Sequence, residues 1–194
     1  MFAGPTVEEL YQFIRERQEI LKTWRESPIP VVAEINGNCY DAGLELIAGC
    51  TARIINNENS CFAVHRGRLG IIPAYGALTK ITGYMTAEKA FKLISGKQYL
   101  DSSAAEGNGL VDQAVYSEVL RKSSLEILQL ILQDSKYYSS LQKRKQRTAT
   151  TLNGKRFLKK IIKSNRRINV ELPDIDIAKA LLQGIQEKEE DALQ

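Results

Sequence analysis

The chain has 194 residues, of which 43% are hydrophobic, and its 27 Lys and Arg against 23 Asp and Glu give a net charge of +4. This size fits one globular domain with a helical appendage. No apolar run approaches the ~20 residues that span a bilayer, and the N-terminus lacks a secretion signal, so we expect a cytoplasmic protein, with an organelle matrix as the alternative. Three cysteines and one histidine exclude a disulfide framework and a zinc-type cluster, so we expect free thiols and no metal site.

The first predicted helix begins at Thr6. The spacing of Thr6 and Glu9 is that of a capping box, in which each residue satisfies a backbone N–H of the other. Ser27-Pro28 is the expected stop signal. Apolar residues recur at helical spacing between these limits: Leu10, Phe13, Ile14, Leu21 and Trp24. One face of this helix is therefore expected to be buried.

Two buried strands are predicted next, with a helix between them. Residues 31–35 and 52–56 are short, rich in β-branched side chains and bounded by turn formers. The helix spans 42–50. A strand, helix and strand in this order predict a right-handed crossover and hence an α/β domain.

The rest of the chain is predicted to be mostly helical. Helices are expected at 74–81, broken by Gly83, and at 86–94, ended by Gly96, followed by a strand at 111–115. Beyond Ser117 the pattern is helical, so the chain divides into an α/β core (1–116) and a helical region (117–194). The apolar positions of that region are Val119, Leu120, Leu125, Leu128 and Leu132 on one helix, Phe157, Leu158, Ile161 and Ile162 on another, and 177–193 as the last.

A basic segment, residues 142–167, carries eleven Lys and Arg and no acidic residue. The rest of the chain therefore has a net charge of −7, because the total is +4. Two interpretations stay open: a solvated helical face, which charge runs on helices usually form, or a surface that meets phosphates.

The junction of the strand at 31–35 with the helix at 42–50 has the composition of an anion-binding site. The helix opens on the small residues Ala42 and Gly43. Small residues let a ligand oxygen approach the unpaired N–H groups of a helix's first turn, where the macrodipole also favours negative charge. Glu45 is expected one turn into the helix, beside such an oxygen.

This junction is followed along the chain by Phe62, by the run 69–73 with Gly76, and by residues 109–112. In this order, the motifs resemble those of the crotonase (enoyl-CoA hydratase/isomerase) superfamily over about residues 30–115. The resemblance implies a ClpP/crotonase spiral core, a role in fatty acid metabolism and assembly into a homotrimer or hexamer. It also implies a site for an acyl-CoA or acyl-pantetheine thioester, whose oxygen is held by two backbone N–H groups as it becomes an enolate. Coenzyme A would enter as part of the substrate, with no other cofactor.

The two N–H groups that hold the thioester oxygen form an oxyanion hole, and the resemblance places only one of them on a residue that has an N–H. One falls on Ala42, with Gly43 beside it. The other falls in the Gly4-Pro5 segment at Pro5, which has no N–H, so half of the hole would be lost. One such donor is worth about 3 kcal/mol of transition-state stabilisation. The family's opening strands would precede this segment, so we expect them to be absent or supplied by another chain.

Glu45 matches the first of the two glutamates with which hydratases activate water. The second position holds Arg66, next to His65. This favours isomerisation or decarboxylation over simple hydration. Arg66 is a candidate for holding a substrate carboxylate, and His65 and Tyr75 are candidate catalytic groups, although a lone histidine in a loop is more often structural.

Three classes of function remain at this point. The first is a crotonase-like lyase or isomerase. The second is a catalytically inactive homologue that serves as a binding or assembly subunit. The third, less favoured, is nucleic-acid binding through 142–167, where Phe157 alone could stack on a base. Our preferred interpretation is that this basic segment meets the phosphates of coenzyme A from a neighbouring subunit, with Lys159 and Lys160 as the candidate residues.

Overall fold

The computed structural model describes residues 4, 6–69, 71–75, 77–146, 155–156, 159 and 178–183. Its elements, in chain order, are α1 (Val7–Glu26), β1 (Val32–Ile35), β2 (Cys39–Tyr40), α2 (Ala42–Ile47), β3 (Ala52–Asn56), β4 (Cys61–Ala63), a 3-10 helix (Arg66–Leu69), α3 (Ala77–Tyr84), α4 (Ala87–Ile94), β5 (Leu100–Asp101), α5 (Ser102–Gly107), β6 (Gln113–Val115), α6 (Ser117–Gln133) and α7 (Ser135–Gln146). No helix in this described part is long and apolar enough to cross a membrane.

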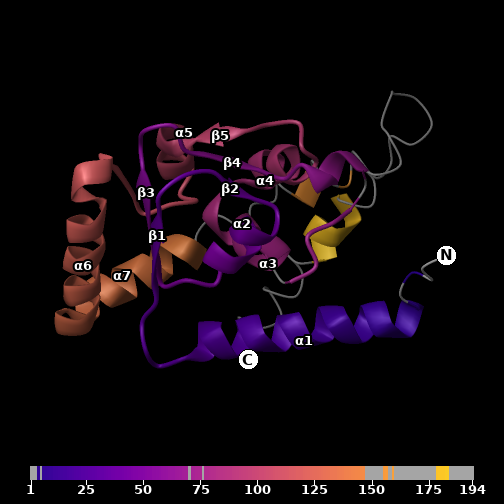
Figure 1. Ribbon diagram of the computed structural model, residues 1–194, viewed down its shortest axis with the longest axis horizontal. Helices are drawn as coiled ribbons and strands as arrows, with labels where there is room; N and C mark the ends of the chain where they lie inside the picture. Colours follow the sequence, from indigo (N-terminus) through magenta and orange to yellow (C-terminus); the bar gives the residue numbers. More distant parts are fainter. Residues whose placement is uncertain are drawn as a thin grey trace.

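The strands form two small sheets (Figure 1). In the first, β3 lies between β1 and β6 and is parallel to both, with Val32 opposite Ala52 and Ile54 opposite Gln113. In the second, β4 lies between β2, to which it is parallel, and β5, to which it is antiparallel. Because α2 connects β2 to β3, it carries the chain from one sheet to the other and lies between them in sequence.

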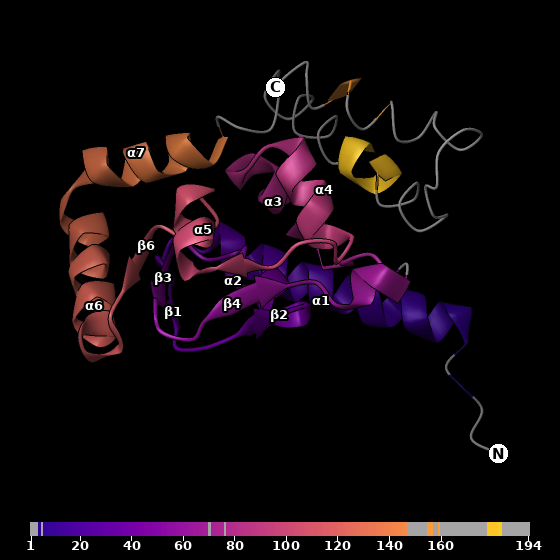
Figure 2. The ribbon, with the colours of Figure 1, turned by 90° about the horizontal axis from the view of Figure 1, so that it is seen from above.

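Two apolar clusters hold these layers together. The larger one joins α2, α3, α4 and α5 to the strands and includes Leu44, Phe62 and Leu93. The smaller one lies between the first sheet and the pair α6 and α7, around Ile54 and Ile127. Both views place α6 and α7 together at one end of the molecule (Figure 2).

Several predicted elements are confirmed. The capping box forms at the start of α1, where the Thr6 N–H donates to Glu9 Oε2 (2.7 Å) and the Glu9 N–H donates to Thr6 Oγ1 (3.2 Å). The hydrogen bonds that Glu9 Oε2 accepts from the Thr6 N–H and from the Thr6 hydroxyl (2.8 Å) lower the pKa of the Glu9 carboxyl. The strands at 31–35 and 52–56 also form, as β1 and β3, and the helix predicted at 42–50 forms as α2 but ends at Ile47. The boundary at 116 and 117 falls between β6 and α6, and the division into two domains stays a prediction.

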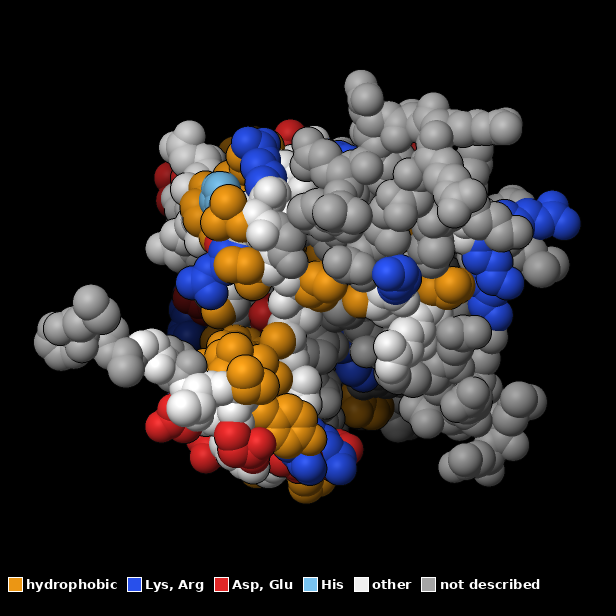
Figure 3. Space-filling view, turned by 90° about the vertical axis from the view of Figure 1, so that its right-hand side faces the viewer, with side chains coloured by type: hydrophobic (Ala, Val, Ile, Leu, Met, Phe, Trp, Pro, Cys, Tyr) orange, Lys and Arg blue, Asp and Glu red, His pale blue; other side chains and the backbone are white. Residues whose placement is uncertain are grey.

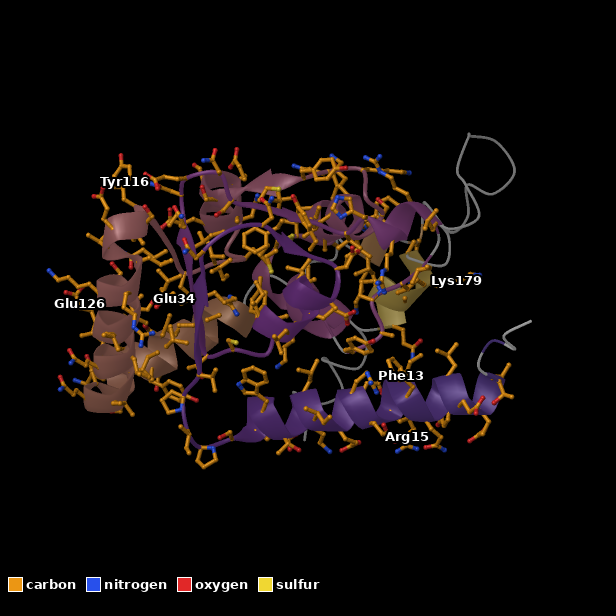
Figure 4. The ribbon with its side chains drawn as sticks, in the orientation of Figure 1. Phe13, Arg15, Glu34, Tyr116, Glu126 and Lys179 are labelled. Carbon is orange, nitrogen blue, oxygen red and sulfur yellow. The ribbon has the colours of Figure 1, made fainter. Side chains whose placement is uncertain are left out.

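The predicted faces of two helices are partly wrong. On α1, Leu21 is buried, but Leu10 and Phe13 are 49% and 44% exposed. Figure 4 shows Phe13 on the side of α1 that faces the rest of the molecule and Arg15 on the other side. The predicted apolar face of α1 is therefore on the correct side, but only its C-terminal part is buried. On α6, Ile127 and Ile131 are buried with Leu120, whereas the predicted Leu125 and Leu132 are exposed.

The boundaries of two other predicted elements change. The helix predicted at 74–81 begins at Ala77 and continues through Gly83, because burial of Ile81 and Tyr84 offsets the roughly 1 kcal/mol that a helical glycine costs. The strand at 111–115 is shorter, as β6. Residues 178–183 of the predicted last helix are helical, and Ala178 and Leu181 are buried. The apolar positions predicted on the helix before it, Phe157, Leu158, Ile161 and Ile162, lie outside the described residues.

The three cysteines are free thiols. Cys39 and Cys50 are buried and Cys61 is half-buried. Burial, with a smaller effect from neighbouring Cys50, raises the pKa of the Cys39 thiol to about 12. In the described part of the chain, no three His, Cys, Asp or Glu side chains gather as metal ligands would.

A buried ion pair connects the middle of the first sheet to the turn before β6. Arg53 on β3 is fully buried, and its Nη2 lies 3.2 Å from Asp112 Oδ2, which also accepts the Arg53 backbone N–H at 2.9 Å. The Arg53 guanidinium lies 4.2 Å from the centre of the Tyr84 ring. Burial raises the pKa of the Tyr84 hydroxyl, which donates to Ala48 O (2.8 Å). Three segments therefore meet at Arg53: β3, the turn before β6, and α3.

We predict that Asp112→Ala lowers the free energy of unfolding by about 3–5 kcal/mol, because it leaves the Arg53 charge buried without its counter-ion. Glu34→Ala is the matched control, since it removes the acid of an exposed pair with Arg121 (3.3 Å) and should cost at most about 1 kcal/mol. Urea unfolding measures both. Equal losses for the two variants would contradict this account.

Candidate functional site

The turn between β2 and α2 has an unusual backbone. Asp41 adopts φ +44° and ψ −110°, one of two residues other than glycine with positive φ among those described. Its N–H donates to Ala63 O on β4 (3.0 Å), and its carbonyl accepts from the Glu45 N–H (3.2 Å). Asp41 is thus the last residue bonded to the second sheet and the first bonded to α2.

The first turn of α2 keeps its N–H groups open. An aspartate before a helix usually accepts from these N–H groups, but the Asp41 side chain makes no such bond. Within the described residues, the N–H groups of Ala42 and Gly43 have no hydrogen-bond partner. Such groups, at the positive end of the helix, attract an anionic oxygen.

Glu45 lies one turn further, among Leu44, Ile47 and other core residues, and is only 8% exposed. Its Oε2 accepts a hydrogen bond from the Tyr75 N–H at 2.6 Å. The loop that supplies this N–H is bound in turn to α1, because the Gln18 side chain donates to Ala74 O (2.6 Å). The structure therefore brings Glu45 and Tyr75 together through the Tyr75 backbone, and a role for the phenol stays a prediction.

His65 and Arg66 lie at the other side of the Asp41 turn. The Arg66 N–H donates to Asp41 Oδ1 (3.2 Å), and His65 Nδ1 lies 3.6 Å from Asp41 Oδ2. The His65 ring is T-shaped against Tyr40, with 4.6 Å between centroids. Figure 3 shows the chain's one histidine at the surface among hydrophobic and basic side chains. The Arg66 side chain is exposed.

The remaining candidates are not brought into this site by any described contact. Gly4 is exposed, and a Cβ added there would meet nothing within 4 Å. Pro5 and Lys160 lie outside the described residues, so the missing donor at Pro5 stays a prediction. Lys159 is exposed and has a helical backbone.

Asp41 is the residue that reasoning from the sequence missed. It directly precedes the helix predicted at 42–50, but its role depends on a positive φ and on contacts with residues 24 and 25 positions away. The only local signal was an aspartate, which tolerates positive φ better than most residues, within a run of small residues.

The arrangement has two chemical components. Unpartnered N–H groups at Ala42 and Gly43 can hold an oxygen that gains negative charge. Glu45 follows them by one turn, at a rise of roughly 1.5 Å per residue, and can accept a proton from an atom next to that oxygen's carbon. Removal of a proton beside a carbonyl group needs both components.

Comparisons with known proteins identify relatives of the chain. The profile of the enoyl-CoA hydratase/isomerase family matches residues 4–190. The fatty acid oxidation complex subunit alpha of Shewanella halifaxensis (strain HAW-EB4) is 32% identical over 129 residues, which are 64% of this chain and 18% of that protein. The chain thus spans less than a fifth of this relative's length.

Solved structures share the fold at lower identity. Pseudomonas aeruginosa DspI superposes with a TM-score of 0.61 and 20% identity, over 100% of this chain and 69% of its own. An enoyl-CoA hydratase from Bacillus anthracis gives a TM-score of 0.61 and 22% identity, over 95% of this chain and 64% of its own. The crotonase fold predicted from the sequence is confirmed.

We predict that Glu45→Ala lowers the free energy of unfolding by about 1–3 kcal/mol, because the Tyr75 N–H loses its acceptor in a buried place. Glu45→Gln keeps an oxygen acceptor there and should cost less. Glu118→Ala, at an exposed position in the first turn of α6, is the control and should cost at most about 1 kcal/mol. Urea unfolding compares the three. A loss for Glu45→Gln as large as that for Glu45→Ala would show that the acceptor is not what matters.

Proposed function

Because the chain belongs to the enoyl-CoA hydratase/isomerase family, we propose that it binds an acyl thioester and stabilises the enolate of its acyl group. The observation that carries this proposal is the Glu45 carboxylate, buried one turn after the unpartnered Ala42 N–H and held by the Tyr75 N–H. The thioester oxygen would accept from Ala42, with Gly43 beside it. Glu45 would take the proton from the α-carbon.

The proposed step is balanced as follows. A Glu45 oxygen bonds the α-proton, the C–H electron pair becomes the new C=C bond, and the thioester carbonyl electrons move to the oxygen held by Ala42. Returning the proton to the γ-carbon of an unsaturated acyl group moves its double bond. Returning it to the α-carbon after solvent exchange restores the substrate.

Isomerase or decarboxylase chemistry fits these residues better than hydration. Activation of water in the family's hydratases uses a second carboxylate, and that position holds Arg66 in this chain. Arg66 is bound to the Asp41 turn through its backbone N–H, and its exposed guanidinium is proposed to hold a carboxylate on the acyl group.

Assembly and the binding of coenzyme A are part of the same proposal. We propose a homotrimer or hexamer in which Lys159, exposed, and its neighbour Lys160 meet the phosphates of coenzyme A bound to the next subunit. Acyl-pantetheine on a carrier protein is the alternative form of the substrate. A non-catalytic binding subunit remains the competing function, and nucleic-acid binding through 142–167, most of which lies outside the described residues, is the less favoured one.

We predict that the chain binds acetyl-CoA and crotonyl-CoA in calorimetric titration and exchanges the α-protons of acetyl-CoA with solvent. Glu45→Gln should bind the same ligands but slow this exchange by at least about 100-fold, because general base catalysis is worth 10²–10⁴. Exchange is followed by NMR in deuterated buffer. A folded chain that binds neither thioester would contradict the enzyme proposal and favour the non-catalytic one, and salt-dependent binding to random RNA instead would favour nucleic-acid binding.

We predict that Arg66→Gln weakens the binding of malonyl-CoA by about tenfold or more, through loss of one charge-assisted hydrogen bond, while the binding of acetyl-CoA changes little. Arg68→Gln is the matched control on the same 3-10 helix. Its guanidinium Nε donates to Gly96 O (2.9 Å), so it is anchored elsewhere. Equal weakening of both ligands, or an equal effect of Arg68→Gln, would rule out a carboxylate contact at Arg66.

A further inference from the structure

We propose that Asp41 is a positioning residue of this site: its carboxylate, bound to the segment after β4, fixes the turn that carries the Ala42 N–H relative to Glu45. This inference rests on the proposed function. It concerns a residue that touches neither the thioester nor the transferred proton in the mechanism above.

The backbone of Asp41 explains why the residue type matters. With φ +44° and ψ −110°, Asp41 lies in a region that side chains other than glycine rarely adopt. Glycine would adopt this conformation without strain. An aspartate at such a position is expected to make side-chain contacts that a glycine cannot make.

Those contacts come from the segment that follows β4. Asp41 Oδ1 accepts from the Arg66 N–H (3.2 Å), and Oδ2 faces His65 Nδ1 (3.6 Å). The His65 ring is itself supported by Tyr40, the residue before Asp41, and lies 5.9 Å from the Tyr99 ring. The carboxylate is therefore bound from the outer side of the turn.

The alternative position of the carboxylate shows what this prevents. An aspartate preceding a helix commonly accepts from the N–H groups of the second or third helical residue. At Asp41 this would put a negative charge, and a competing acceptor, at the place proposed for the thioester oxygen. The contacts with Arg66 and His65 hold the carboxylate elsewhere, so the Ala42 and Gly43 N–H groups stay unpartnered within the described residues.

The same contacts fix the geometry between the two parts of the site. Asp41 is bonded to β4 through its N–H and to Glu45 through its carbonyl. A shift of this turn would move the Ala42 N–H relative to the Glu45 carboxylate. Misplacement by about 1 Å can cost a reaction 10²-fold.

Two substitutions separate the side chain from the backbone. Asp41→Asn keeps an oxygen that accepts from the Arg66 N–H and tolerates positive φ. Asp41→Gly removes the acceptor but relieves the strain, so its melting temperature should stay within about 5 °C of the wild type. We expect α-proton exchange in Asp41→Gly to fall by 10- to 100-fold in kcat with KM changed less than about threefold, and Asp41→Asn to stay within about threefold of the wild type.

The closing experiment measures wild type, Asp41→Asn, Asp41→Gly and Glu45→Gln together, by α-proton exchange and by amide hydrogen exchange of peptides covering 41–47 and 64–70. Loss in Asp41→Gly with rescue by Asp41→Asn supports the proposal. Wild-type kcat in Asp41→Gly overturns it. If Asp41→Gly does not fold, His65→Ala, which removes one of the two contacts, should speed amide exchange of the 41–47 peptide, a readout that a catalytic role of His65 would not move, and unchanged exchange there would overturn the proposal.

A failure of the proposed function is distinguishable from a failure of this inference. If wild type and Glu45→Gln exchange α-protons equally slowly, the proposed function fails. Amide exchange then decides the positioning role by itself. Faster exchange at 41–47 in Asp41→Gly but not in Asp41→Asn would show that the carboxylate holds the turn, and unchanged exchange in both variants would show that it does not.

Discussion

Burial of the Glu45 carboxylate is the constraint on which the site depends. A charged group with little access to water must find partners in the protein, and Oε2 finds the Tyr75 N–H at 2.6 Å. That contact brings the loop before α3 onto α2. The Gln18 bond to Ala74 then fastens α1 to the same loop, so three separate segments take their positions around one side chain.

A buried ion pair on the first sheet fixes further elements of the fold around this arrangement. β3 runs through the first sheet with all five residues buried, and Arg53 on it gathers Asp112, Tyr84 and the Cys50 carbonyl. Arg53 Nε is buried and makes no hydrogen bond within the described residues, so the pair is incompletely satisfied. A buried pair of this kind is costly to break and contributes less to stability than its geometry suggests. Its evident effect is to fix the relative places of β3, β6 and α3.

The sequence was sufficient wherever the signal was local or repeated. The capping box at Thr6 lies within four residues, and the β-branched runs of β1 and β3 are continuous, so both were predicted correctly. The strands β2, β4 and β5 have two or three residues and too few positions to show alternation. On α6, Leu125 and Leu132 flank the buried face, so an apolar residue alone could not indicate which side packs.

The candidate site shows the same difference between local and long-range signals. Ala42 and Glu45 belong to one short motif, and the family resemblance identified both. The bond between Glu45 and Tyr75 joins residues 30 positions apart, and the contacts of Asp41 depend on a turn whose φ no residue pattern specifies. The contacts of Asp41 exist only after the second sheet has formed, because β4 pairs with β2 in that sheet and brings His65 and Arg66 beside the turn.

The central claim is that the first turn of α2 holds a thioester oxygen as negative charge develops on it. The most direct measurement is the ¹³C NMR shift of the carbonyl carbon of [1-¹³C]acetyl-CoA bound to the Glu45→Gln protein, which is predicted to bind the ligand and to exchange its protons at least about 100-fold more slowly. Hydrogen bonds from the Ala42 and Gly43 N–H groups polarise that carbonyl, so the account predicts a clear downfield shift relative to free acetyl-CoA. Saturating binding with the carbonyl resonance unmoved would contradict it, because the oxygen would then lie away from α2.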